Sequence, residues 1–153
     1  MKIIGFNINK ILIERKNPIK GRLEIKSNLD IKDIQEEKVP IFDKQLSLKF
    51  DFSFTVDYNP NIAKIEVNGS VITLEEKLEF EEILKDWKKK KFPSKLKIPL
   101  FNFILNKCNI KVIPLEEEMG LPLHIPFPKL RPEPERTNKS TKSTISGPAN
   151  YTG

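Results

Sequence analysis

Few residues in this sequence have side chains that could do covalent chemistry. It contains one cysteine, Cys108, and one histidine, His124. A cysteine and a histidine can act as nucleophile and base, but only if the folded chain brings them within hydrogen-bond reach. No other residue supports such a pair, and a free cysteine in an apolar segment most often packs as a small core residue. The sequence therefore predicts a protein that is not an enzyme and has no catalytic residues.

Metal and cofactor motifs are also missing. His124 has no cysteine or acidic residue at a spacing typical of metal ligands. There is no glycine-rich phosphate loop, no CxxC and no HExxH. Asp51 and Asp57 lie on the polar side of an alternating segment, which is typical of solvated carboxylates rather than of an acid–base pair. We expect neither a metal nor a cofactor.

Composition narrows the class of protein further. The chain of 153 residues fits one domain, and its 27 basic and 21 acidic residues give a net charge of +6. Because the two signs are interspersed, a solvated surface is favoured over a nucleic-acid patch. One cysteine cannot form an intrachain disulfide, and no apolar run reaches the roughly 20 residues of a membrane helix. These features, with no signal peptide at the start, indicate a cytoplasmic protein without membrane insertion.

The clearest structural pattern runs from Leu46 to Tyr58, where apolar and polar residues alternate strictly. Period-two alternation predicts a long strand with one face in a core and the other in water, as in an antiparallel sheet. The sequence Asn59-Pro60-Asn61 then predicts a turn. Residues 63–73 alternate again, and we interpret Asn68-Gly69 as a bulge within one strand rather than a tight turn.

Two strands are expected upstream. Residues 23–31 alternate in one phase, and residues 11–13 form a short piece whose phase differs from that of Phe6 and Ile8. This slip near Lys10 predicts a bulge. Residues 36–43 are expected to form a loop. The order of these segments predicts an antiparallel sheet, either a meander or a Greek key.

Helical spacing begins after residue 73. Thr73-Leu-Glu-Glu76 has the pattern of a capping box, which predicts a helix starting at Thr73 and ending near Pro93. The basic run Lys88, Lys89, Lys90 and Lys91 fits the negative end of that helix, although a nucleic-acid patch is the alternative. A second, very apolar helix is expected to begin with Pro99 in its first turn.

The end of the chain changes character twice. Residues 110–113 are expected to link the second helix to a turn between Pro114 and Gly120. Residues 121–130, which we call the strap, are apolar and punctuated by proline, so we expect them to lie extended on the protein surface. Residues 131–153 are rich in Pro, Ser, Thr and Lys and are predicted to be a disordered polar tail. The expected domain is therefore residues 1–130.

This order of elements resembles the SecB family of protein-export chaperones, in a Lys- and Ile-rich version of archaeal type. The resemblance covers roughly Lys2 to Leu130. It is carried by the long strand 46–58, by the strand 63–73, by Pro99-Leu-Phe-Asn-Phe-Ile-Leu-Asn-Lys-Cys-Asn109 and by Leu121-Pro-Leu-His-Ile-Pro-Phe127. One feature departs from the family: bacterial members are acidic on the sheet face that docks the motor SecA, whereas this chain is basic. SecA docking is therefore doubtful here.

The resemblance implies an α+β fold, with a four-stranded antiparallel sheet and two helices packed on one of its faces. It also implies an ATP-independent holdase that binds unfolded or nascent polypeptides, assembled as a dimer or a dimer of dimers. The apolar groove would be lined by residues of the second helix and the strap: Phe101, Phe103, Leu105, Leu121, Leu123, Ile125 and Phe127. For each of them, plain core packing or a subunit contact is the alternative. The alternative function is a basic protein that docks on RNA or the ribosome through Lys88–Lys91 and the tail.

Overall fold

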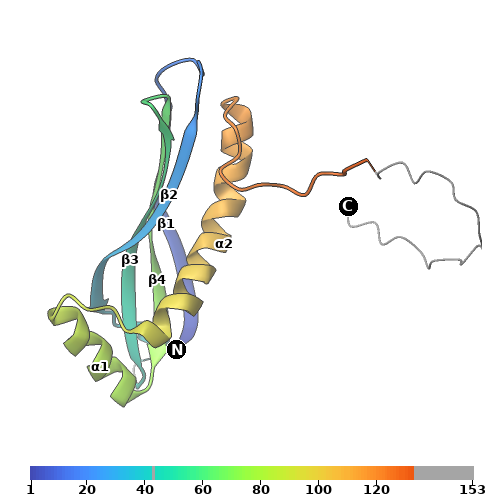
Figure 1. The fold of residues 1–153 in the computed structure, drawn as a ribbon. Coiled ribbons are helices and arrows are strands. Elements are labelled where there is room, and N and C mark those ends of the chain that lie inside the picture. The colour runs from blue at the N-terminus through green and yellow to red at the C-terminus, as the bar shows by residue number, and fades with distance from the viewer. Residues whose placement is uncertain (43, 133–153) are drawn as a thin grey trace, which may run out of the picture.

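A computed structural model describes residues 1–42 and 44–132 of the chain. These residues form a four-stranded antiparallel sheet followed by two helices, which is the α+β fold expected from the sequence (Figure 1). The predicted disordered tail, residues 131–153, lies outside the described residues from residue 133 onward. Of that segment, Arg131 and Pro132 are described, and both are exposed.

The strands are β1 (Lys2–Arg15), β2 (Glu24–Glu36), β3 (Leu46–Asn59) and β4 (Ala63–Glu75). Their order in the sheet is β1-β4-β3-β2, and every neighbouring pair is antiparallel. Strands β2, β3 and β4 are joined in succession as hairpins. Strand β1 lies beside β4. The topology is therefore a Greek key and not a meander. It leaves β1 and β2 as the two edges of the sheet.

The alternation in β3 determines where the core lies. Its apolar residues point to the helix-covered face and its polar residues to the opposite face, as predicted. The polar face carries an ion pair between Lys49 Nζ and Asp51 Oδ1 at 3.5 Å, which agrees with the expected solvated surface. Leu46 is half-buried, and the apolar side chains that follow it in β3 are exposed by 2 % or less: Leu48, Phe50, Phe52, Phe54, Val56 and Tyr58.

The turn predicted at residues 59–61 is present, and it also fastens the crossover from β1 to β2. The backbone N–H of Lys16 donates to the Ile62 carbonyl at 2.7 Å, and the Asn17 side chain donates to the Asn61 carbonyl at 2.7 Å. These bonds satisfy backbone groups that a turn would otherwise leave to water. They hold the long crossover against the far end of the β3–β4 hairpin.

The strand interpretation of residues 63–73 is confirmed, but the bulge lies elsewhere. Strand β4 pairs with β3 without any register shift. The β1–β4 ladder instead shifts register between Ile8 and Lys10, as the phase slip in β1 predicted, and also between Ile3 and Gly5. The reason that Gly69 is glycine is close approach: a Cβ there would lie 2.2 Å from the Asn7 carbonyl oxygen and 2.7 Å from the Phe52 ring.

The predicted capping box is wrong. Thr73 and Glu75 belong to β4, and the Thr73 hydroxyl donates to the Glu75 carboxylate at 2.6 Å along the strand. Helix α1 (Lys77–Lys88) starts later, with Glu76 as an N-cap that makes no side-chain hydrogen bond. Strand pairing with β1 and β3 outweighs the local helix signal, because it buries Thr73 and Glu75.

The predicted limits of the second helix are wrong at both ends. Helix α2 (Ser94–Glu118) is one continuous element of 25 residues with Pro99 and Pro114 inside it. Both prolines are exposed, so water can reach the carbonyl that each leaves without an N–H partner. A stripe with no exposed surface begins just after Pro99, continues past Pro114 and holds the helix to the sheet: Leu100, Ile104, Cys108, Val112 and Glu116.

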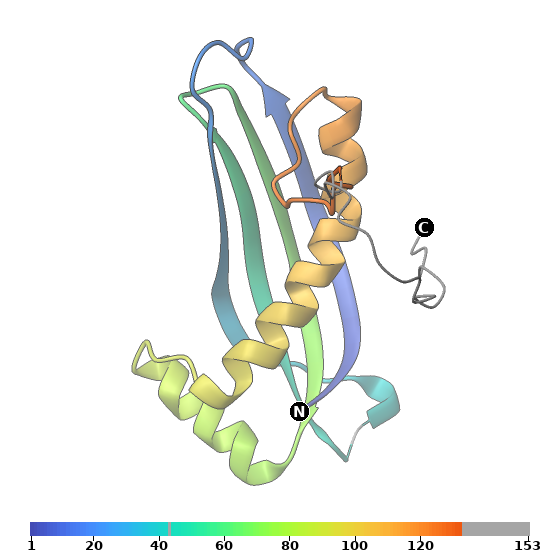
Figure 2. The same cartoon turned by 45° about the vertical axis from the view of Figure 1, so that its right-hand side comes forward.

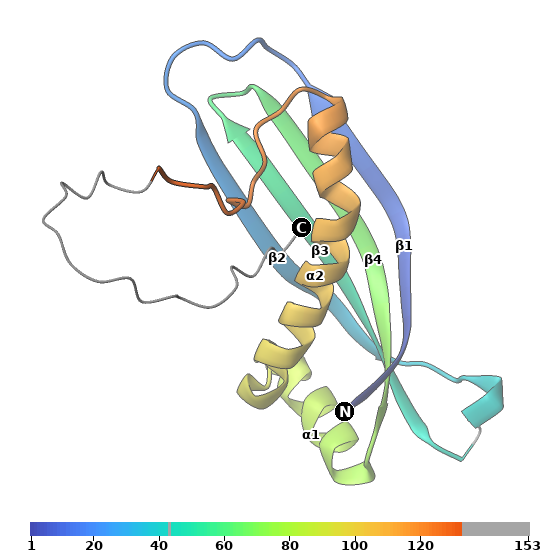
Figure 3. The ribbon, with the colours of Figure 1, turned by 90° about the vertical axis from the view of Figure 1, so that its right-hand side faces the viewer.

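Gly120 ends helix α2, at a φ of 64°. Its N–H bonds to the Glu117 carbonyl and the N–H of Leu121 bonds to the Glu116 carbonyl, a pattern that terminates a helix and reverses the chain. The strap then returns beside α2 on the same face of the sheet (Figures 2 and 3). Its inner half, Leu121–Ile125, is mostly buried or half-buried, whereas its outer half, 126–130, is exposed.

Candidate functional site

The structure does not bring Cys108 and His124 together as a nucleophile and base. Both ring nitrogens of His124 are engaged by other side chains, those of Glu116 and Asn109. Cys108 has no exposed surface, and burial raises the pKa of its thiol to about 12. A neutral, buried thiol is a poor nucleophile. The chemistry considered for this pair has no geometric support.

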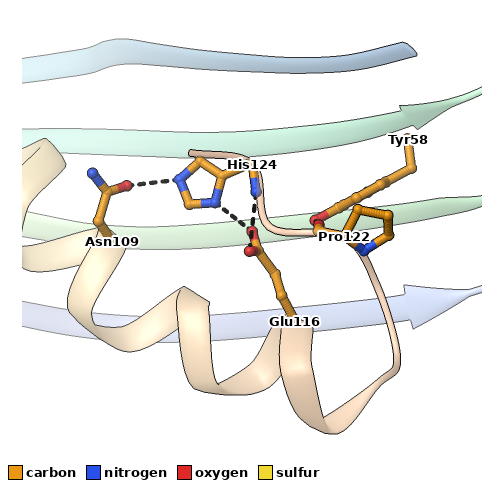
Figure 4. A network of polar contacts seen from close by, with 5 residues as sticks. All are labelled: Tyr58, Asn109, Glu116, Pro122 and His124. Carbon is orange, nitrogen blue, oxygen red and sulfur yellow. Dashed lines mark hydrogen bonds and ion pairs between the residues drawn. The ribbon is translucent and has the colours of Figure 1, made fainter. Parts of the chain in front are cut away.

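His124 instead organises a buried polar network (Figure 4). Its Nδ1 contacts Glu116 Oε1, and its Nε2 lies 2.8 Å from Asn109 Oδ1. The backbone N–H of His124 also donates to Glu116 Oε2 at 3.2 Å. The Glu116 side chain is 0 % exposed and that of His124 is 3 % exposed. The two carboxylate oxygens of Glu116 thus both face the strap.

Two elements position this network. Asn109 and Glu116 are two turns apart on α2, so they lie on one side of the helix. The reversal at Gly120 then carries His124 back to a point between them. Tyr58 of β3 completes the site, because its hydroxyl donates to the Pro122 carbonyl at 2.7 Å. Burial, and then the neighbouring Glu116 carboxylate, raise the pKa of Tyr58.

The network sits on an aromatic floor. The His124 ring meets the Phe54 ring edge to face, with centroids 5.8 Å apart. Phe54 is a core residue of β3, so the strap forms the outer wall of the core at this point. Sequence reasoning missed Glu116, since Glu116–Glu118 was assigned to a turn. The only sequence signal for this site is the spacing of Asn109 and Glu116. That spacing places both residues on one side of a helix only if the helix continues past Pro114.

The residues predicted to line one groove are divided between the two flanks of α2. Phe103 packs against Phe6 of β1, with centroids 5.8 Å apart. Phe101 packs on the other flank against Phe92, at 5.7 Å. Leu105 is half-buried. In the strap, Leu121 is buried, Leu123 and Ile125 are half-buried, and Phe127 is 54 % exposed.

A pocket of about 500 Å³, with a mixed lining of apolar and lysine side chains, lies between the edge strand β1 and helix α2. It is lined by Phe6, Ile8, Lys107, Ile110 and Lys111. Ile110 is 68 % exposed, and neighbouring Ile11 of β1 is 44 % exposed. Strand β1 pairs with β4 alone within the sheet, so the main-chain groups on its outer side face away from the sheet.

The basic run Lys88–Lys91 is where α1 ends. Lys90 adopts a φ of 57°, and the N–H of Lys91 bonds to the Asp86 carbonyl at 2.9 Å. This hydrogen bonding ends the helix, and the lysines are exposed. The adjacent aromatic ring, Trp87, is held by Asp33, to which its indole N–H donates at 3.3 Å. The run therefore lies at the C-terminal end of α1.

In residues 1–42 and 44–132, no group of three or more His, Cys, Asp or Glu side chains is arranged to hold a metal ion. No helix within the same part of the chain is long and apolar enough to cross a membrane.

Comparison with known proteins gives one likeness of fold. A SecB-like chaperone of Mycobacterium tuberculosis, solved in complex with a ChAD peptide from the HigA1 antitoxin, is similar to this chain with a TM-score of 0.47 and 10 % identity. The likeness covers 86 % of this chain and 91 % of that one. No family model and no curated protein sequence matches the chain. At this TM-score and identity, the likeness carries no conclusion about ligands or activity.

Proposed function

We propose that the protein is an ATP-independent holdase that binds non-native polypeptides and has no enzymatic activity. The observation that carries this proposal is the open edge of β1 beside the pocket between β1 and α2, where Ile110 and Ile11 are exposed apolar side chains. Exposed apolar surface next to unpaired main-chain groups is what an extended, unfolded segment can use. The expected resemblance to SecB points to the same function.

Binding at this edge would combine two interactions. The polypeptide would add as a strand to β1 through main-chain hydrogen bonds, which do not depend on its sequence. Its apolar side chains would enter the pocket against Ile8 and Ile110. Lys107 and Lys111 line the same pocket and would favour segments that carry an acidic residue.

We expect the protein to act as a homo-oligomer, a dimer or a dimer of dimers, as the resemblance implies. Docking of a motor such as SecA stays doubtful. The polar face of the sheet pairs Lys49 with Asp51 and is not a continuous acidic surface. The link to protein export is therefore the weakest part of the resemblance, whereas capture of apolar segments depends only on the β1 edge and its pocket.

Aggregation of a chemically unfolded substrate protein tests the proposal when followed at low and high salt, with the oligomer mass measured in the same sample. Apolar capture should persist at high salt. Binding of RNA through Lys88–Lys91 should weaken steeply because it depends on counterion release. Failure to suppress aggregation at either salt concentration would overturn the holdase proposal, and salt-sensitive RNA binding in its place would favour the alternative.

Two matched variants locate the site on α2. Ile110→Gln removes an apolar side chain from the pocket, whereas Ile98→Gln changes a residue of the same type on the same helix that is 71 % exposed and does not line the pocket. We expect Ile110→Gln to reduce suppression several-fold, because burying an isoleucine contributes about 1.5–3 kcal/mol. Ile98→Gln should suppress aggregation like the wild type. Equal effects of the two changes would remove the pocket from the mechanism.

A further inference from the structure

The inner half of the strap is held in the way that a protein holds a bound peptide. It is an irregular segment that bends at His124 and Ile125, and the groups that fix it belong to β3 and α2. Tyr58 of β3 donates to its Pro122 carbonyl at 2.7 Å. Asn109 and Glu116 of α2 contact the His124 ring, and Glu116 also accepts the His124 N–H. Phe54 provides the apolar floor.

The strap is attached to α2 through polar contacts, although apolar contacts in the same place often give a more stable protein. A buried carboxyl group costs several kcal/mol of desolvation unless its partners compensate it, and well-packed aliphatic residues in its place often give a more stable protein. For Glu116, the hydrogen bonds to its side chain come from His124. Once the strap lifts, Glu116 regains water. Glu116 is therefore hydrogen-bonded in the docked state and hydrated in the lifted state, whereas a leucine at this position would expose an apolar side chain to water when the strap lifts.

The outer half of the strap offers a starting point for lifting. Phe127 is 54 % exposed and Leu130 is fully exposed, so the end of the strap next to Ile125 is free of the body of the protein (Figure 3). At the other end, Leu121 is buried and tied to the Glu116 carbonyl. The strap can thus peel from its outer end toward an anchored base at Gly120–Leu121.

We infer that the surface formed by Phe54, Tyr58, Asn109 and Glu116 is a peptide-binding site that the strap occupies in cis. Its ligand class is an apolar segment with a histidine, for which the strap is the template. The histidine ring meets Asn109 and Glu116, and a carbonyl two residues before it meets Tyr58. The strap and a polypeptide compete for this site, so the strap regulates access to it. This site is separate from the β1–α2 pocket and stands whether or not the protein is a holdase.

The test uses the full chain and a fluorescein-labelled heptapeptide with the sequence of residues 121–127. The His124→Ala protein, whose strap is weakened, should bind this peptide at least tenfold more tightly than the wild type, as measured by fluorescence anisotropy. Lys129→Ala, in the exposed outer half, is the control and should bind like the wild type. A heptapeptide with alanine in place of its histidine should bind the His124→Ala protein at least tenfold more weakly.

Two outcomes would overturn the inference: equal affinity of the peptide for the wild type and for His124→Ala, or equal affinity of the two peptides. If His124→Ala fails to fold, the wild type still decides. Saturating unlabelled peptide should then accelerate amide hydrogen exchange of residues 123–125 while leaving the β3 amides unchanged. No acceleration would also refute competition. Because no substrate protein is involved, these results are independent of the aggregation assay.

Discussion

The pair Glu116–His124 is best examined by a double-mutant cycle on the free energy of unfolding. The three variants are Glu116→Leu, His124→Ala and Glu116→Leu/His124→Ala. In the structure, removing the His124 side chain deletes the contact with Glu116, the hydrogen bond with Asn109 and the edge contact with Phe54. The cycle then isolates the energy that Glu116 and His124 share.

The expected magnitude of the His124→Ala effect depends on whether the strap can lift. If the strap stayed rigid, Glu116 would be left buried without its partner, and breaking such a pair costs about 3–5 kcal/mol. If the strap lifts, Glu116 is hydrated, and the loss is limited to the docking energy of the inner half. We expect that docking energy to be about 1–2 kcal/mol, since it rests on a few hydrogen bonds, each worth about 0.5–1.5 kcal/mol, and one aromatic contact.

The double variant should lose less than the sum of the two single variants. In Glu116→Leu the histidine loses a buried partner, and in His124→Ala the carboxyl group loses its own, whereas the double variant contains neither orphan. We expect a coupling of at least about 1 kcal/mol. Urea unfolding followed by circular dichroism gives the free energies, and hydrogen exchange of the strap amides shows whether it has lifted.

Two results would refute this reasoning. Additivity of the single variants within about 0.5 kcal/mol would show that Glu116 and His124 are not energetically coupled. A loss of about 4 kcal/mol in His124→Ala, with strap amides still protected, would show that the strap is a rigid part of the core. In that case it could not act as a reversible cover.

The remaining predictions concern positions away from this network. Gly69→Ala should lower the free energy of unfolding by about 2–3 kcal/mol through overpacking, because the new Cβ would lie 2.2 Å from the Asn7 carbonyl oxygen. The control is Gly5→Ala, where the new Cβ would lie 3.4 Å from Ile72, its nearest neighbour. In urea unfolding, the control should lose no more than about 0.5 kcal/mol of that free energy. The Cys108 thiol has a pKa of 9.0 in the unfolded chain and about 12 in the folded protein, so it ionises first in the unfolded chain. As the pH rises between those two values, the free energy of unfolding should therefore fall by no more than about 1.4 kcal/mol per pH unit. Urea unfolding at a series of pH values should show a shallower fall in Cys108→Ala, and an unchanged pH slope in that variant would contradict the assignment.

The sheet could be predicted from the sequence because its signal is local. In β3, each apolar residue from Leu46 to Tyr58 sits two positions from the next, and one strand face becomes the core whatever lies further along the chain. The phase slip before Lys10 likewise predicted the irregularity of β1. The order of the strands was left open between two topologies, because strand pairing depends on which hairpins form and not on any single segment.

The helices were harder to place because long-range packing outweighs local propensity. Thr73–Glu76 has the residues of a capping box, yet the first three of them complete β4. Pro114 indicates a helix end, yet α2 continues because Val112 and Glu116 are buried on either side of it. Local start and stop signals are decisive only where no partner surface competes for the same residues.

Glu116 shows why the candidate site itself could not be predicted. A glutamate before a glycine at a chain reversal normally belongs on the surface, since a carboxylate is almost never fully buried unless it is paired. Its partner, His124, lies beyond the reversal and looked like an isolated residue in a proline-rich segment. The two residues explain each other. His124 is the partner of the buried Glu116 carboxylate, and Glu116 is buried where His124 covers it. The prolines of the strap limit the conformations of the undocked segment. They therefore reduce the entropy that is lost when the strap docks. A stiff, apolar segment that is attached through a few hydrogen bonds is well suited to leave and return, which is the property that a competing cover of a peptide site requires.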